Sequence, residues 1–264
     1  MSVLAQARPP EPFHAPGLEA FRPPCIVEWN AFGVNFCVDR GVIYTFLAAA
    51  IVIALFVLAA RGGSLVPRGV RNFVESIVDF IREEIAVQVI GQEGRPWVPF
   101  LTSLFSFILV ANIFGVLPGL QLAATSRMAI PAFLAVLVWT LFVVTGIRNQ
   151  GAGYFRNVLF PPGIPWPIYF LLTPIEFVST FLVRPLTLSV RLLANMMAGH
   201  LILTIFFLGT AYLLAKPSTI PFAVPAFALS VMLLAFEMLV ALLQAYIFTI
   251  LTAVYIAGAV HPEH

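Results

Sequence analysis

The chain has 264 residues, of which 61% are hydrophobic and only 10% are charged, and its mean hydropathy is +0.99. Soluble domains of this size are not so apolar, and a formal net charge of +2 gives no nucleic-acid signal. The composition therefore predicts an all-α polytopic membrane protein. Its basic residues are thirteen arginines and one lysine, which fits the plasma membrane of a GC-rich bacterium better than the mitochondrial inner membrane.

Residues 1–40 are polar and rich in proline, and we expect an external tail there. This segment holds the only two cysteines of the chain, Cys25 and Cys37. Aromatic and β-branched residues between them favour a short hairpin around residues 30–33, which would bring the sulfurs together. On the oxidising side of the membrane a disulfide between them would persist, and two unrelated free thiols are the alternative.

An uninterrupted apolar run predicts a transmembrane helix over residues 41–61. It stops at Arg61, and Arg68 and Arg71 follow within ten residues. By the positive-inside rule this end is cytoplasmic, which leaves the N-terminus outside.

Residues 69–90 show a different pattern, with apolar side chains at helical spacing and charged ones on the other face. The segment is too charged to span, so we expect an amphipathic helix on the cytoplasmic surface or against a partner helix. The apolar positions are Val70, Phe73, Val74, Ile77, Val78, Ile81 and Ile85.

Two further spans are predicted within residues 98–148, with Arg127 in a short external loop between them. A proline-rich turn over residues 161–167 then leads to a long tilted hairpin, residues 174–258, which turns around Lys216 and ends in the cytoplasm. Each arm would measure about 50 Å, against a hydrocarbon core of about 30 Å, so the arms must tilt, kink or run partly outside the core.

The polar residues of this hairpin fall into register when its arms are folded antiparallel about residue 218. Arg191 lies about 27 residues before the turn and Gln244 about 26 after it, so the two meet near mid-membrane. His200 and Glu237 lie about 18 before and 19 after, which puts them together about 13 Å nearer the external side.

Helical spacing places Arg191 and Asn195 on one face of the first arm, together with Arg184 and Thr187, and turns His200 to roughly the opposite face. A charged guanidinium at the bilayer centre costs roughly 3 to more than 10 kcal/mol, so Arg191 is a functional candidate. An imidazole beside a carboxylate exchanges protons near neutral pH, although such a pair can also be purely structural. On the second arm Tyr255 shares the stripe of Glu237 and Gln244.

The run from Arg191 to His200 (RLLANMMAGH), followed by Glu237 and by LQAYIF over residues 243–248, closely resembles subunit a of F-type ATP synthase. The resemblance extends through Pro174-Ile175-Glu176, the Arg184-Pro185 step and NIFGVLP over residues 112–118, and it covers roughly residues 70–258. It implies a stator subunit that faces a rotating ring of c subunits and supplies two offset aqueous half-channels for protons.

The resemblance also implies roles for single residues. The essential arginine of the family matches Arg191, which attracts the ring carboxylate and blocks direct proton leakage, and the nearby glutamine and asparagine match Gln244 and Asn195. Many bacterial members carry an acid at the position of His200 and a histidine at that of Glu237, so this chain has the exchanged arrangement. Glu176 matches a family acid only loosely, because its spacing from Arg191 differs from that in some members.

Two other functions are alternatives. A secondary proton-coupled transporter or antiporter also places charges at mid-membrane, but it usually has internal repeats and more spans, and a flagellar-type motor stator has a large cytoplasmic domain. No phosphate loop, metal-ligand cluster or nucleophile–base pair is evident, so we expect a non-catalytic subunit without cofactor or metal. The implied partners are the c-subunit ring, b-type peripheral stalk subunits, the whole F1F0 complex and membrane lipid, and no nucleic acid.

Overall fold

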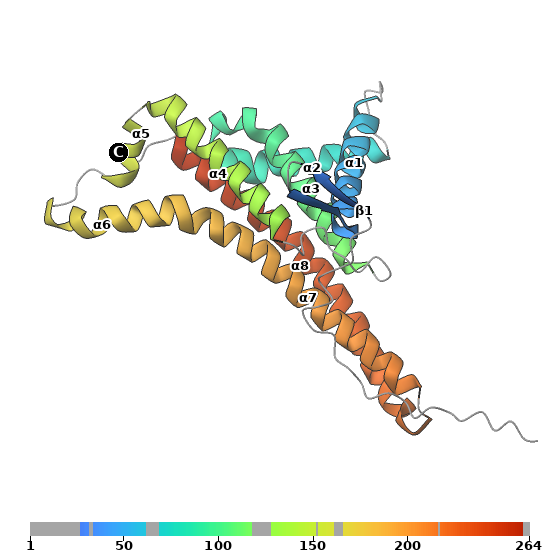
Figure 1. Cartoon of the computed structure of the whole chain (residues 1–264). Helices are drawn as coiled ribbons and strands as arrows, with labels where there is room; N and C mark the ends of the chain where they lie inside the picture. The colour runs from blue at the N-terminus through green and yellow to red at the C-terminus, as the bar shows by residue number, and fades with distance from the viewer. Residues whose placement is uncertain are drawn as a thin grey trace, which may run out of the picture.

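The computed structural model describes residues 27–31, 34–61, 69–117, 128–151, 153–160, 166–215 and 217–260 (Figure 1). Five helices in this part of the chain are long and apolar enough to cross a membrane. This confirms the predicted all-α polytopic architecture, to which the structure adds one two-stranded hairpin near the N-terminus.

The hairpin consists of β1 (Val27–Ala31) and β2 (Val34–Val38), paired antiparallel. The pairing of Ala31 with Val34 confirms the predicted hairpin. In its register the Cα of Cys37 lies opposite that of Glu28. Cys25 and the rest of residues 1–26 lie outside the described residues, so the disulfide stays a prediction.

Helix α1 (Arg40–Ala60) begins directly after the hairpin, where the carboxylate of Asp39 accepts a hydrogen bond of 2.9 Å from the amide of Val42. This cap satisfies one of the free amides of the first turn. Further along, Ala48 packs against Ala111 and Phe114 of helix α3. Because Ala48 and Ala111 have small side chains, the backbones of α1 and α3 can approach closely.

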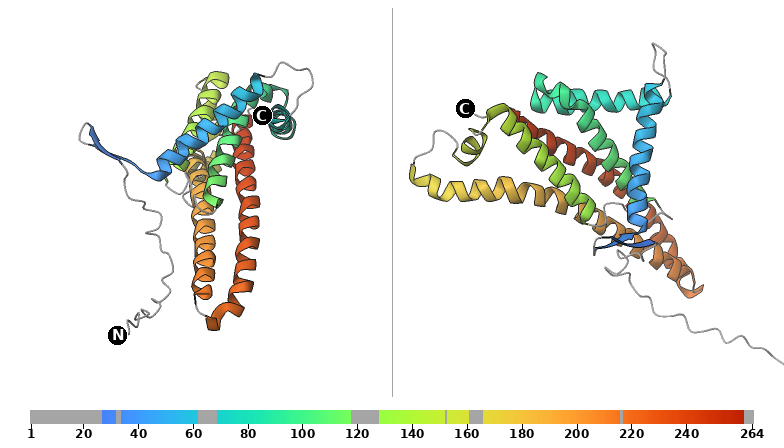
Figure 2. Two further views of the ribbon diagram at one scale, coloured as in Figure 1. Left: turned by 90° about the vertical axis from the view of Figure 1, so that its right-hand side faces the viewer. Right: turned by 45° about the horizontal axis from the view of Figure 1, so that its top comes forward.

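The predicted amphipathic segment corresponds to α2 (Val70–Phe80), which continues into a π-helical stretch, η2 (Ile81–Ile90). The two lie across the end of α1 where that helix stops (Figure 2). Their apolar side is buried through Val74, Ile81 and Ile85. The stretch η2 packs against α3 and α8 of the same chain, and the position of the segment on the cytoplasmic surface stays a prediction.

A short 3-10 turn, η3 (Gln92–Trp97), leads into α3 (Val98–Val116), and α4 (Ala129–Gln150) and the short α5 (Gly153–Leu159) follow. Helix α3 is the most enclosed of the long helices, because it packs between α1 and α8. The loop that holds Arg127 lies outside the described residues.

The first arm of the long hairpin is α6 (Trp166–Val178), a π-helical turn η5 (Ser179–Val183) and α7 (Arg184–Leu214) in one continuous run. It begins at Trp166, so the prediction of a start at residue 174 was wrong. Pro167 lies in the first turn, where its missing amide has no helical partner to lose, and Pro174 is accommodated inside α6. Proline therefore did not mark the boundary that the sequence suggested.

After the short η6 (Pro217–Thr219), α8 (Ile220–Val260) returns beside α7 and continues along α3, α4 and η2 (Figures 1 and 2). Lys216 at the tip lies outside the described residues. Only 22% and 17% of the most apolar windows of the two arms are buried within the chain. The arms thus leave long apolar faces for lipid or a partner to cover.

Candidate functional site

Arg191 lies on the outward face of α7. It is exposed, as are Val190 and Ala194 on the same side, whereas Leu188 and Leu192 are almost fully buried on the inner side. The guanidinium therefore projects from an otherwise apolar surface. In a membrane such a charge requires a partner that approaches this face.

The antiparallel register of α7 and α8 is set by two direct contacts. The carboxyl group of Glu237 lies against Gly199, and nearer the tip the buried hydroxyls of Thr210 and Ser230 lie 3.4 Å apart. Eight residues back from Gly199 and seven forward from Glu237, Arg191 comes level with Gln244. This is the register that the sequence predicted.

Gln244 and Asn195 lie at the level of Arg191 but differ in exposure. Gln244 faces inward and is 5% exposed, and its Nε2 donates no hydrogen bond within the described residues. Asn195 is half-buried between the inner and outer faces. Two amide side chains thus accompany Arg191 without enclosing it.

His200 and Glu237 are both buried, each 8% exposed, and lie at the same depth. His200 faces the interior while Arg191 faces out, as the nine-residue spacing predicted. Both carboxylate oxygens of Glu237 are buried and accept no hydrogen bond from any described residue, so the two side chains share a depth without a direct hydrogen bond, and their action as a pair stays a prediction. The carboxyl group instead fills the space that Gly199 leaves open.

A cavity of about 180 Å³ lies beside this carboxylate. Asn195, Gly199 and Val240 are among the residues that line it, with Glu237. It therefore runs along the hairpin from the level of Asn195 past Glu237 to that of Leu203 and Leu233. Since it contains a carboxylate and an amide among apolar side chains, it can hold water beside an ionisable group.

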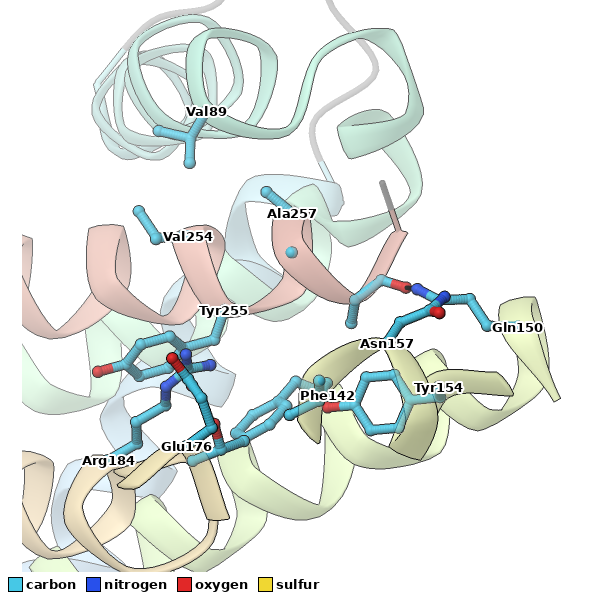
Figure 3. Close-up of a pocket in the computed structure, with 14 residues that line it drawn as sticks. Val89, Phe142, Gln150, Tyr154, Asn157, Glu176, Arg184, Val254, Tyr255 and Ala257 are labelled. Atoms are coloured by element: carbon cyan, nitrogen blue, oxygen red, sulfur yellow. Dashed lines mark hydrogen bonds between the residues drawn. The ribbon is translucent and has the colours of Figure 1, made fainter. Parts of the chain in front are cut away.

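A larger cavity of about 640 Å³ lies toward the opposite end of α7, between α4, α5, η5 and the end of α8 (Figure 3). Glu176, Arg184 and Tyr255 line it, and the Arg184 guanidinium lies over the Tyr255 ring at 5.3 Å from its centroid. The structure thus brings Glu176 and Tyr255 together, which sequence reasoning had named separately.

Four further polar residues of this cavity were missed: Gln150, Tyr154, Asn157 and Thr180. The amide of Asn157 donates to Gln150 at 3.1 Å, and Gln150 donates to the carbonyl of Ala259 at 3.2 Å. These bonds tie α5, α4 and the end of α8 together. For Gln150, Tyr154 and Asn157 the sequence signal was only a run of polar residues after the third span, to which no role was assigned.

Tyr154 forms part of the same wall. An added Cβ on Gly146 of α4 would collide with its ring, so glycine permits this close packing. Burial raises the pKa of the Tyr154 phenol above its usual value, against an opposing effect of the Arg184 charge. The phenol therefore stays protonated and can donate a hydrogen bond.

Relative to Arg191, the two cavities lie on opposite sides along α7. Arg184 precedes it by seven residues, about 10 Å, and Gly199 follows it by eight, about 12 Å. Neither cavity is lined by Arg191. In the described part of the chain no group of three or more His, Cys, Asp or Glu side chains is placed to hold a metal ion.

Comparison with known proteins supplies the family. Residues 42–257 match the family described as ATP synthase A chain. The chain belongs to this family. It is 45% identical over 257 residues to ATP synthase subunit a of Frankia alni, covering 96% of this chain and 89% of that protein.

Further relatives carry the same name. The identity is 40% over 255 residues to ATP synthase subunit a of Rhodococcus erythropolis, covering 95% of this chain and 92% of that protein. It is 35% over 256 residues to that of Streptomyces lividans, with 96% and 89% covered. Membership of this family argues against the alternative function of a secondary transporter. The relatives named here are all bacterial.

Proposed function

We propose that this chain is the stator subunit a of the membrane sector of a bacterial F-type ATP synthase and carries protons through two offset half-channels. Protons enter from one side through the cavity beside Glu237, bind to a carboxylate of the rotating ring and leave on the other side through the cavity at Arg184. The chain itself binds no nucleotide and catalyses no reaction.

The observation that carries this proposal is the arrangement of the two cavities about Arg191. A continuous pore would let protons cross without rotation. Two separate cavities, displaced along α7 and interrupted by a cation, instead require an external carrier between them. A ring carboxylate that passes Arg191 has this role: near the guanidinium it is held ionised, and away from it, in lipid, it takes up a proton.

The outward face of α7 suits a ring of c subunits. Ala194 and Ala198, one and two turns beyond Arg191, are exposed and small. Small side chains let another helix backbone approach closely in a membrane. A partner helix on this face would bring its own carboxylate within reach of Arg191.

The proposed orientation puts the N-terminal hairpin outside and the C-terminus in the cytoplasm. Arg61, Arg148 and Arg156 all lie at the end of the molecule where α1 and α4 stop, together with α2 and α5 (Figure 2). The positive-inside rule assigns this end to the cytoplasm. The cavity at Arg184 then opens toward the cytoplasm, and b-type stalk subunits contact the complex from that side.

The test is Arg191→Ala in the complex, reconstituted in vesicles. Coupled ATP synthesis is lost while the complex assembles, and passive proton leak through the membrane sector increases. Arg148→Ala, which removes an exposed arginine away from both cavities, is the matched control and leaves synthesis unchanged. Normal synthesis by assembled Arg191→Ala would overturn the proposal.

A second experiment tests the two half-channels separately. In a background with Cys25 and Cys37 replaced by serine, single cysteines at Gly199 and Thr180 are exposed to a membrane-impermeant thiol reagent on one side at a time. The proposal expects Gly199→Cys to react only from the external side and Thr180→Cys only from the cytoplasmic side. Reaction of either from both sides would mean a continuous pore.

A further inference from the structure

A third cavity, of about 700 Å³, lies away from the proton path between α1, α2, η2 and the start of α3. Its residues belong to two groups, one apolar and one polar. The apolar group is Phe56, Val78, Val98 and Pro99, and the polar group is Arg82, Glu83, Arg95, Thr102 and Ser103.

This cavity lies where two candidate spans meet a charged segment. Phe56 lies in the last turns of α1, which ends at Ala60, and Val98 is the first residue of α3. Both helices are candidate spans, so the cavity opens where the apolar part of the molecule gives way to the charged α2–η2 segment. Phospholipid headgroups lie at this depth.

The charges that line the cavity are only partly used within the chain. Arg82 pairs with Asp79 at 2.9 Å. Among the described residues no ion pair is formed by Arg95 or by Glu83, and both are exposed. The cavity thus offers one available cation and one available anion.

A buried hydroxyl supplies the second, independent observation. Thr102 is 1% exposed, and its Oγ1 has no hydrogen-bond partner in the described part of the chain. The neighbouring Ser103 donates to the carbonyl of Pro99 at 2.7 Å, as hydroxyls in helices usually do. An unsatisfied buried hydroxyl that lines a cavity indicates a missing partner.

We propose that this cavity binds a phospholipid whose headgroup is a phosphate joined to a primary amine, as in phosphatidylethanolamine. The phosphate accepts hydrogen bonds from Arg95 and Thr102, and the ammonium group pairs with Glu83. The acyl chains run along Phe56 and Val78. An anionic glycerol headgroup leaves the Glu83 carboxylate without a cation, so the site prefers the zwitterionic lipid.

The experiment uses the purified complex in nanodiscs with a trace of phosphatidylethanolamine that carries a photoreactive acyl chain. Labelling of the segment 95–103 is located by mass spectrometry, and unlabelled phosphatidylethanolamine, phosphatidylglycerol or inorganic phosphate is added as competitor. Phosphatidylethanolamine displaces the label best and phosphate does not displace it. Equal or stronger displacement by phosphatidylglycerol would overturn the assignment of the amine, and displacement by inorganic phosphate alone would overturn that of the lipid.

Variants separate the two headgroup contacts. Arg95→Gln weakens the binding of both lipids about tenfold, which is the equivalent of one charge-assisted hydrogen bond. Glu83→Gln weakens only phosphatidylethanolamine and removes the preference, and Arg148→Gln, an exposed arginine outside the cavity, changes neither. Unchanged labelling in Arg95→Gln, or a helix of another subunit cross-linked in place of lipid, would refute the proposal.

Discussion

Gly199 should control proton flux although it carries no ionisable group. An ideal Cβ at this position would lie 2.7 Å from the carboxyl carbon of Glu237 and 3.2 Å from its Cγ. Ordinary carbon–carbon contacts are about 3.5–4.0 Å, so Gly199→Ala displaces the carboxyl group by about 1 Å. Because the obstacle is a side chain beside a cavity of about 180 Å³, the carboxyl group can swing aside.

The consequence is a change in function larger than the change in stability. Overpacking costs about 1–3 kcal/mol, and we expect the low end because the side chain has space to move. A displacement of about 1 Å at a reacting group reduces rates by up to about 100-fold. Gly199→Ala should therefore assemble normally and lower proton-driven ATP synthesis by about 10- to 100-fold.

The assay is ATP synthesis in reconstituted vesicles at a fixed proton-motive force, with complex content measured by quantitative gel analysis. Gly209→Ala is the control, since it makes the same change in the same helix where an added Cβ meets nothing within 4 Å. Shortening the acid in Gly199→Ala/Glu237→Asp should recover part of the rate. Equal rates in Gly199→Ala and Gly209→Ala would refute the steric reasoning.

Three further outcomes are expected. Single alanine variants of His200 and Glu237 slow proton flux strongly, and the exchange of the two residues recovers part of it; additive losses with no recovery in vesicle flux measurements would show that they act independently. Arg191→Lys lowers coupled synthesis by at least about tenfold, because the ammonium lacks the planar fork that holds a carboxylate, and rates near wild type would contradict this. Alkylation and mass spectrometry of the unreduced protein detect a bridge between Cys25 and Cys37, whereas two alkylated thiols mean that none forms.

The depth and the facing direction of the site residues on α7 and α8 could be predicted, because both follow from the regular rise and rotation of a helix. Two polar residues on each arm of one hairpin sufficed to derive the register that places Gln244 level with Arg191, because both arms are long helices joined by a short turn. The opposite orientation of His200 followed from the same rise and rotation. These are properties of a single helix and need no knowledge of tertiary packing.

What could not be predicted arises from contacts between elements distant in sequence. The wall formed by Gln150, Tyr154 and Asn157 depends on a sharp reversal between α4 and α5 that leaves no periodic pattern. The start of the first arm at Trp166 depends on how well a helix tolerates Pro174 inside it. Whether His200 and Glu237 form a hydrogen bond depends on their side-chain conformations, which spacing along the chain does not determine.

The missing bond also bears on how the entry cavity works. If Glu237 were locked to His200, a proton reaching the cavity would have to break that bond before it moved on. The carboxyl group lies instead against a glycine, with both oxygens buried and available. Such a group accepts a proton from water in the cavity without first giving up a protein partner, and His200 at the same depth is a second group that can take it.

The exchange of His200 and Glu237 keeps this chemistry but moves the acid to α7, away from the space beside Gly199. Recovery in the exchange variant should therefore be partial. Adding Gly199→Ala to it should displace the imidazole at position 237 but not the acid at position 200, so the added loss should be smaller than in the wild-type background. A loss as large as in the wild-type background would mean that the glycine acts on the helix backbone rather than on the carboxylate.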